Sequence, residues 1–228
     1  MIVVISSCSA KKDDSVPIPK NSRRVSLADY LGNINLIRRL ETTRESIFKD
    51  PRSKVGTKDT YAFDLYVRAG YAYKNLKASN ETKLKEMMYS GKLQWFFLSG
   101  GYGIIHALEP ARKYQATFNR AIAYKNKIPF TATQWKGTLS EMIDSAVSKF
   151  DPEWVFFFGS QDYYAFFKES KVGCSNRNVR LFESTGSSGP HWLSPIIGKL
   201  AGAIVDGQVE KFGNNFGCFT KQQAIGKR

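Results

Sequence analysis

The sequence has few of the residues on which disulfide-rich and metal-dependent proteins are built. Its 228 residues include three cysteines, at positions 8, 174 and 218, and two histidines. Such scattered thiols do not support a disulfide framework or a zinc site, and two histidines do not make a histidine-rich metal centre. We therefore expect a protein with no metal and no cofactor, from a reducing compartment, and we assign it to the cytoplasm.

Long apolar runs are missing as well, and so is any lipidation motif. Residues 1–5 (MIVVI) lack the positively charged region of a signal peptide and are predicted to begin a strand. We therefore expect no membrane partner.

Acidic residues are in short supply. The chain has 20 Asp and Glu against 34 Lys and Arg, which gives a formal net charge of +14. An excess of this size indicates a polyanionic partner, most simply nucleic acid. Because 42% of the residues are hydrophobic and 14% aromatic, the chain can also bury a large core. These properties predict a basic globular protein that binds DNA.

Short apolar segments alternate with amphipathic ones along the chain. The apolar segments predict strands at residues 2–6, 94–98, 154–158 and 179–182. Helices are predicted at about 27–32, from 34 onward, and at 61–76, 81–89, 118–124, 135–147 and 191–205. This alternation predicts one α/β domain over residues 1–228, with a mostly parallel central sheet flanked by helices. Within it, 13–60 is an irregular or helical excursion and 210–228 a basic, loop-like tail.

A glycine-dense segment follows the second predicted strand and is interpreted as a loop over residues 99–114. Glycines such as Gly100 and Gly101 accept positive φ and let backbone N–H groups approach a phosphate or sugar closely. A tight corner without a ligand is the alternative for a Gly-Gly pair. The polar and aromatic residues that follow favour a site, namely Tyr102, His106, Glu109, Arg112 and Tyr114.

Parallel α/β sheets bind ligands beyond the carboxyl ends of their strands. We therefore expect the loops at 6–12, 99–114, 159–164 and 183–192 to form one cationic cleft. In the first of these, a solvated basic turn fits the sequence as well as a phosphate site does. The residues expected to bind substrate or DNA are Ser7, Cys8, Ser9, Lys11, Lys12, Ser99, Gly100, Gly101, Tyr102, Arg112, Tyr114, Gly159, Ser160, Tyr163, His191 and Trp192.

Several motifs follow one another in a particular order between residues 2 and 170. They are VVISSCSAKK (3–12), DLY (64–66), LSGGYGIIH (98–106), Glu109, KY (113–114) and VFFFGSQDY (155–163). This order resembles that of the YaaA-like superfamily and its bacterial and phage relatives. The resemblance implies a compact α/β domain with a cationic cleft that binds DNA, and a role in phage defence by excision of hypermodified bases. Those relatives often have Tyr-Asp where this chain has Tyr114-Gln115, so that position offers no carboxylate here.

Two classes of function fit these features. The first is a DNA glycosylase, in which a carboxylate stabilises an oxocarbenium-like transition state, a proton donor stabilises the departing base, and aromatic rings hold the everted base. Glu109 is the preferred catalytic carboxylate and Asp162 the second choice, with Glu183 also near a predicted strand end. His106 and His191 are the candidate proton donors. The second class is a protein that binds or protects DNA without turnover. A nucleoside deoxyribosyltransferase-like enzyme is a weaker third, because it does not need so large a positive charge.

Overall fold

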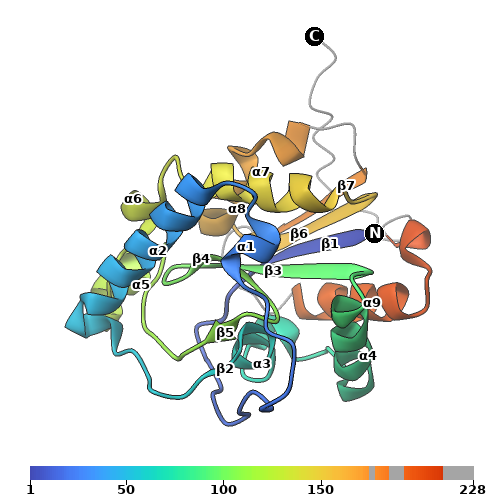
Figure 1. Ribbon diagram of the computed structural model, residues 1–228, viewed down its shortest axis with the longest axis horizontal. Coiled ribbons are helices and arrows are strands. Elements are labelled where there is room, and N and C mark those ends of the chain that lie inside the picture. Colours follow the sequence, from blue (N-terminus) through green and yellow to red (C-terminus); the bar gives the residue numbers. More distant parts are fainter. Residues whose placement is uncertain (175–177, 185–192, 213–228) are drawn as a thin grey trace.

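A five-stranded sheet lies at the centre of the computed structural model, which describes residues 1–174, 178–184 and 193–212. The strand order is β4-β3-β1-β6-β7 (Figure 1). β1, β3, β6 and β7 are parallel, whereas β4 runs antiparallel to β3. The bounds are β1 Ile2–Ser7, β3 Leu93–Ser99, β4 Gly103–His106, β6 Trp154–Ser160 and β7 Asn178–Ser184. The predicted α/β fold with a mostly parallel sheet is confirmed.

Helices cover both faces of the sheet. In Figure 1, α7 and α8 lie on one side and α4 and α9 on the other. α1 and α2 contact β4 through Tyr30 and Arg44, which both donate to the Ile104 carbonyl oxygen. A two-stranded ladder of β2 (Thr60–Tyr61) and β5 (Pro110–Ala111) lies beside α3. The helices are α1 Leu27–Tyr30, α2 Ile34–Lys49, α3 Ala62–Val67, α4 Ala78–Tyr89, α5 Arg120–Asn126, α6 Ala132–Trp135, α7 Leu139–Phe150, α8 Gln161–Lys168 and α9 Leu193–Val205. Short 3₁₀ turns occur at Pro51–Ser53, Tyr71–Tyr73, Lys171–Cys174 and Val209–Lys211.

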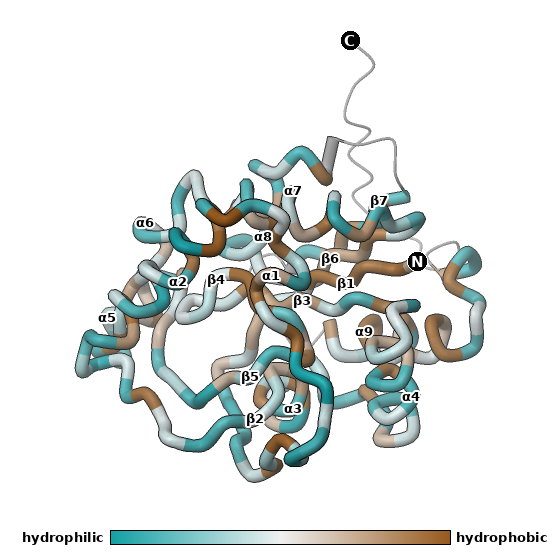
Figure 2. Tube along the Cα trace, viewed as in Figure 1, coloured by the Kyte–Doolittle hydropathy of each residue, from teal (hydrophilic) through white to brown (hydrophobic). Residues whose placement is uncertain are grey.

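The central strands β1, β3 and β6 are buried over nearly their whole length, which explains their mostly apolar sequence. All seven residues of β3 are buried, and so are the first six of β6. Figure 2 shows the same property as continuous hydrophobic colouring along β1. A sheet covered on both faces has no solvent side, so its strands show no polar alternation.

The segment 99–114 differs from the predicted loop, because residues 103–106 form β4. Gly103 makes the turn with a φ of +68°, and a Cβ there would lie 2.6 Å from the Trp135 ring. A Cβ on Gly101 would lie 2.5 Å from the Tyr114 ring. The carbonyl of Gly100 accepts hydrogen bonds from Thr131 Oγ1 (2.7 Å) and Trp135 Nε1 (3.0 Å). These glycines therefore serve close packing within a hairpin.

Three other elements differ from the prediction. The helix expected at 61–76 is divided into α3 and a 3₁₀ turn around Gly70, where a Cβ would lie 2.4 Å from the Tyr66 carbonyl oxygen. The loop expected at 159–164 does not exist, because α8 begins directly after β6. In the expected tail, residues up to 212 include a 3₁₀ turn, and residues 213–228 lie outside the described part of the chain.

Candidate functional site

A pocket of about 980 Å³ opens at the carboxyl ends of β1 and β6. We call it the strand-end pocket. It is lined by residues 7–12 after β1, by parts of 114–128, and by residues 160–163 where α8 begins. Ser6 pairs with Phe158 in the parallel register, so the two strands end side by side. Three of the four segments expected to form a cleft contribute to the lining, namely 6–12, 159–164 and, through Tyr114 alone, 99–114. Most of the fourth, 183–192, lies outside the described residues.

Asp162 is a half-buried carboxylate in the wall of this pocket. Its Oδ2 accepts a hydrogen bond from Asn119 Nδ2 at 2.8 Å. The other end of the Asn119 amide caps α5 by accepting from the Ile122 N–H at 2.9 Å, so the NH₂ group is oriented toward Asp162. Within the described residues no Lys or Arg forms an ion pair with Asp162. Asp162 is therefore oriented by a neutral amide and has no ion-pair partner among the residues that the structure describes.

Tyr163 lies beside Asp162 and faces Cys8 across the pocket. The phenol oxygen of Tyr163 is 3.3 Å from Cys8 Sγ, and its ring packs against Phe118 with centroids 5.0 Å apart. Burial raises the pKa of Tyr163 well above its ordinary value of 10, so the phenol stays protonated. The pocket thus has a hydrogen-bond donor on an aromatic ring that packs against Phe118.

Lys12 lies over a buried tyrosine at the floor of the pocket. Its Nζ is 4.2 Å from the ring centroid of Tyr114. Burial lowers the pKa of Lys12, and the nearby Cys8 side chain opposes this effect. Lys11 and Lys54 also line the pocket, so its described lining has three lysines and one carboxylate. This composition agrees with the expected cationic cleft.

The OH group of Tyr114 is held in place by the hydroxyl groups of Ser99 and Tyr66. Its OH is 2.5 Å from Ser99 Oγ and 3.2 Å from the Tyr66 OH. The Ser99 hydroxyl also accepts a hydrogen bond from the Tyr102 N–H at 3.0 Å. Ser99 therefore supports the pocket floor without lining the pocket. Gly100, Gly101 and Gly159 do not line it either.

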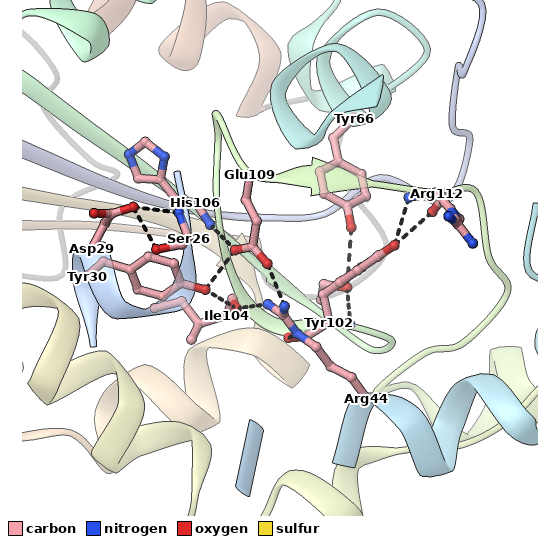
Figure 3. A network of polar contacts seen from close by, with 11 residues as sticks. Ser26, Asp29, Tyr30, Arg44, Tyr66, Tyr102, Ile104, His106, Glu109 and Arg112 are labelled. Carbon is pink, nitrogen blue, oxygen red and sulfur yellow. Dashed lines mark hydrogen bonds and ion pairs between the residues drawn. The ribbon is translucent and has the colours of Figure 1, made fainter. Parts of the chain in front are cut away.

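Glu109 belongs to a separate buried network, shown in Figure 3. Its Oε1 is 2.5 Å from Arg44 Nη1, and its Oε2 accepts a hydrogen bond from the Tyr30 OH at 2.8 Å. Arg44 also donates to the carbonyl oxygens of Tyr102 (2.9 Å) and Ile104 (2.7 Å). The side chains of Glu109 and Arg44 are only 8% and 11% exposed. Glu109 borders a shallower depression of about 560 Å³ and not the strand-end pocket.

His106 is also part of this buried region. Its Nε2 lies 2.9 Å from Gln94 Oε1, and its Nδ1 accepts the Leu108 N–H at 3.1 Å. A neutral ring protonated at Nε2 satisfies both contacts, whereas a second proton at Nδ1 would face a donor. Burial, the main cause, lowers the pKa of His106 to about 3. His106 lies opposite Phe96 on β3 and does not line the strand-end pocket.

The remaining predicted site residues lie elsewhere. Tyr102 is buried, and its OH accepts the Arg112 N–H at 2.7 Å. The Arg112 side chain is exposed and bonds to Asp59 at 2.7 Å. His191 and Trp192 lie outside the described residues. Asn119 was not among the predicted site residues, because the helix predicted at 118–124 enclosed it, whereas α5 begins at Arg120 and Asn119 is its cap.

A scan of protein-family models found none that matches this chain, and a search of curated proteins found no match either. Across the described residues, no group of three or more His, Cys, Asp or Glu side chains is arranged to hold a metal ion. In the same part of the chain, no helix is both long and apolar enough to cross a membrane.

Proposed function

We propose that the protein binds DNA and cleaves the N-glycosidic bond of a nucleobase that is everted into the strand-end pocket, leaving an abasic site. The observation that carries this proposal is Asp162, a half-buried carboxylate without a cationic partner among the described residues, in a pocket of about 980 Å³. A volume near the upper end of the usual ligand range, about 300–1,000 Å³, has room for a flipped nucleotide. The resemblance to phage-defence proteins favours a modified base as the substrate.

In the proposed reaction the C1′–N bond breaks as positive charge develops on the sugar. Asp162 stabilises this oxocarbenium-like charge or aligns the water that adds to C1′. The departing base takes its proton from water, because the raised pKa of the Tyr163 phenol makes it a poor acid, and the Tyr163 ring is available to stack on the base. Asp162 replaces Glu109 as our preferred carboxylate, because Glu109 is already paired with Arg44 and lies outside the pocket.

The lysines at the pocket supply the contacts to the DNA backbone. Lys11 is exposed beside the pocket, and Lys54 also lines it. Each phosphate that the protein neutralises lowers the logarithm of the binding constant by about 0.9 per unit of log salt concentration. Lys11→Ala should therefore make this slope shallower by about 0.9, the value expected for the loss of one phosphate contact. An affinity that does not change with salt concentration would contradict DNA binding.

The decisive experiment incubates the protein with unmodified DNA and with base-modified phage DNA, and measures abasic sites and released bases by mass spectrometry. We expect release from at least one modified DNA by the wild-type protein and none by Asp162→Asn at equal DNA affinity. A wild-type protein that binds DNA tightly but releases no base supports the second candidate, a DNA-binding protein without turnover. That candidate is favoured by the net charge of +14, which does not depend on Asp162.

A further inference from the structure

Lys12 differs from the other lysines that line the pocket, Lys11 and Lys54, because its side chain is half-buried whereas theirs are exposed. Two lysines outside the pocket are paired with carboxylates. Lys113, on the neighbouring segment, is 3.0 Å from Asp14, and Lys85 is 2.6 Å from Asp64. Lys12 has no carboxylate partner among the described residues, and its Nζ lies over the Tyr114 ring instead. The face of the Tyr114 ring attracts the charged ammonium form, whereas burial lowers the pKa of Lys12 and so raises the fraction of neutral amine relative to an exposed lysine. A neutral lysine amine is a nucleophile toward carbonyl carbon.

The ring under this amine is fixed by its surroundings. Tyr114 is buried and bonded to Ser99 and Tyr66, so the ring under Lys12 cannot turn freely. Lys12 and Asp162 line the same strand-end pocket. A nucleophilic amine and a carboxylate base therefore face one ligand space, a combination that simple phosphate binding does not require.

We propose that Lys12 forms an imine with the aldehyde of an abasic site in the strand-end pocket, and that the protein is thereby an abasic-site lyase as well. This inference rests on the proposed function, whose product is that abasic site. The Lys12 nitrogen attacks C1′ of the ring-opened sugar, and loss of water gives the protonated imine. Asp162 or water then removes a proton from C2′, the C3′–O bond breaks, and the phosphate leaves. Hydrolysis of the imine returns the amine, so the sequence needs no oxidant or reductant.

The test uses an oligonucleotide with one abasic site, prepared by removing uracil from a deoxyuridine residue. Borohydride reduces an imine to a stable amine, so an imine-forming protein becomes covalently attached to the DNA. We expect a covalent complex with the wild-type protein, and a tryptic peptide that carries the adduct on Lys12. Lys12→Arg keeps the positive charge but cannot form the imine, so trapping should fall by about tenfold or more.

Lys113→Arg is the matched control, because it makes the same chemical change in a lysine that lies outside the pocket and is paired with Asp14. It should trap like the wild type, and thermal melting should show that both variants are folded. Trapping by Lys12→Arg at the wild-type level would overturn the proposal, as would a wild-type protein that binds abasic DNA without being trapped.

Failure of this inference can be told apart from failure of the proposed function, because the abasic site is supplied ready-made. A wild-type protein that releases bases from modified DNA but neither traps nor cleaves abasic DNA is a glycosylase without lyase activity. If the wild-type protein is trapped through Lys12 but releases no base, the lyase inference stands and the proposed glycosylase function is contradicted.

Discussion

Two carboxylates that the sequence presents as near equivalents lie in opposite environments. Glu109 is enclosed, with Arg44 and Tyr30 bonded to its two oxygens. Asp162 is half-buried at a pocket, and one oxygen is bonded to the Asn119 amide. Both are close to a glycine-containing strand end in the sequence. The comparison shows that proximity to a strand end does not decide which carboxylate is available for chemistry; what matters is which bonds the fold has already used.

The Glu109 network connects elements that would otherwise meet only through apolar contacts. Arg44 comes from α2, Tyr30 from α1, and Glu109 follows β4. A buried ion pair contributes little net stability compared with an apolar core, but loss of one partner leaves the other charge buried and unpaired. Substitutions in this region are therefore expected to lower the stability of the protein, whereas substitutions in the strand-end pocket are expected to lower the reaction rate.

The largest expected effect is that of Asp162→Asn on base release. Because the carboxylate acts mainly in the transition state, the rate should fall by about 10²–10⁴-fold while DNA affinity and melting temperature stay close to those of the wild type. Single-turnover release of the base from modified DNA measures this. Glu169→Gln, an exposed change after the other end of α8, is the control and should keep full activity. If Glu109→Gln abolishes release in a fully folded protein, the assignment of roles must be reversed.

Glu109→Gln should have the second largest effect, on stability. Removal of one charge from a buried pair costs about 3–5 kcal/mol, and the retained amide oxygen should place this variant near the lower value. Urea unfolding at neutral pH measures the change. Glu141→Gln is the matched control, since Glu141 pairs with Arg39 at the surface with side chains 55% and 50% exposed. That pair should contribute no more than about 1 kcal/mol. Equal losses in the two variants would argue against a structural role for Glu109.

Tyr163→Ala should weaken the binding of DNA that carries a flipped base. Stacking of one base on an aromatic ring contributes about 1–3 kcal/mol, which titration with abasic-site and intact oligonucleotides can measure. Tyr102→Ala is the comparison in the buried region, where Arg44 lies over the Tyr102 ring at 5.1 Å. It should lower stability without a specific loss of binding. If Tyr102→Ala weakened binding specifically and Tyr163→Ala only lowered stability, Tyr102 and not Tyr163 would be the residue that stacks on the base.

The last expected effect, absent at neutral pH, is a pH dependence of stability that comes from His106. Burial lowers its pKa from 6.5 to about 3 in the folded protein, so the unfolded chain binds more protons between these values. The stabilisation from this residue is complete above about pH 6.5 and is lost as pH falls toward 3, with a slope of up to about 1.4 kcal/mol per pH unit. His106→Gln should flatten the unfolding free energy between pH 4 and 6 by about this slope. An unchanged slope would show that His106 is not held neutral.

Much of the fold was predictable because the central strands are mostly apolar. Residues 94–98 and 154–158 were recognisable as buried strands, and Asn33 correctly marked the start of α2, where its side chain accepts from the Asn35 N–H at 2.9 Å. Their parallel order then placed the loops after β1 and β6 together. β4 was missed because Gly103 to His106 adjoin the glycines, and a tight turn into an edge strand has the same local sequence as a loop.

The candidate site was less predictable, because its composition depends on long-range contacts. Nothing in the sequence near Asn119 indicates that its amide reaches Asp162, which lies 43 residues away. Likewise, the partner of Glu109 is Arg44, 65 residues away on a helix that the sequence analysis did not connect with the site. Residue type and spacing identify candidates, but bonds of this length decide which side chains remain accessible.

The place of β1 in the middle of the sheet has a consequence for synthesis of the chain. Ile2 pairs with Leu93 on one side and with Trp154 on the other, about 90 and about 150 residues further along. At a translation rate of roughly 5–20 residues per second, β1 waits for several seconds or more before both neighbours exist. During that time its apolar residues are open to chaperones and to other nascent chains. The Cys8 and Lys12 side of the pocket therefore takes its final form only after α8 has left the ribosome.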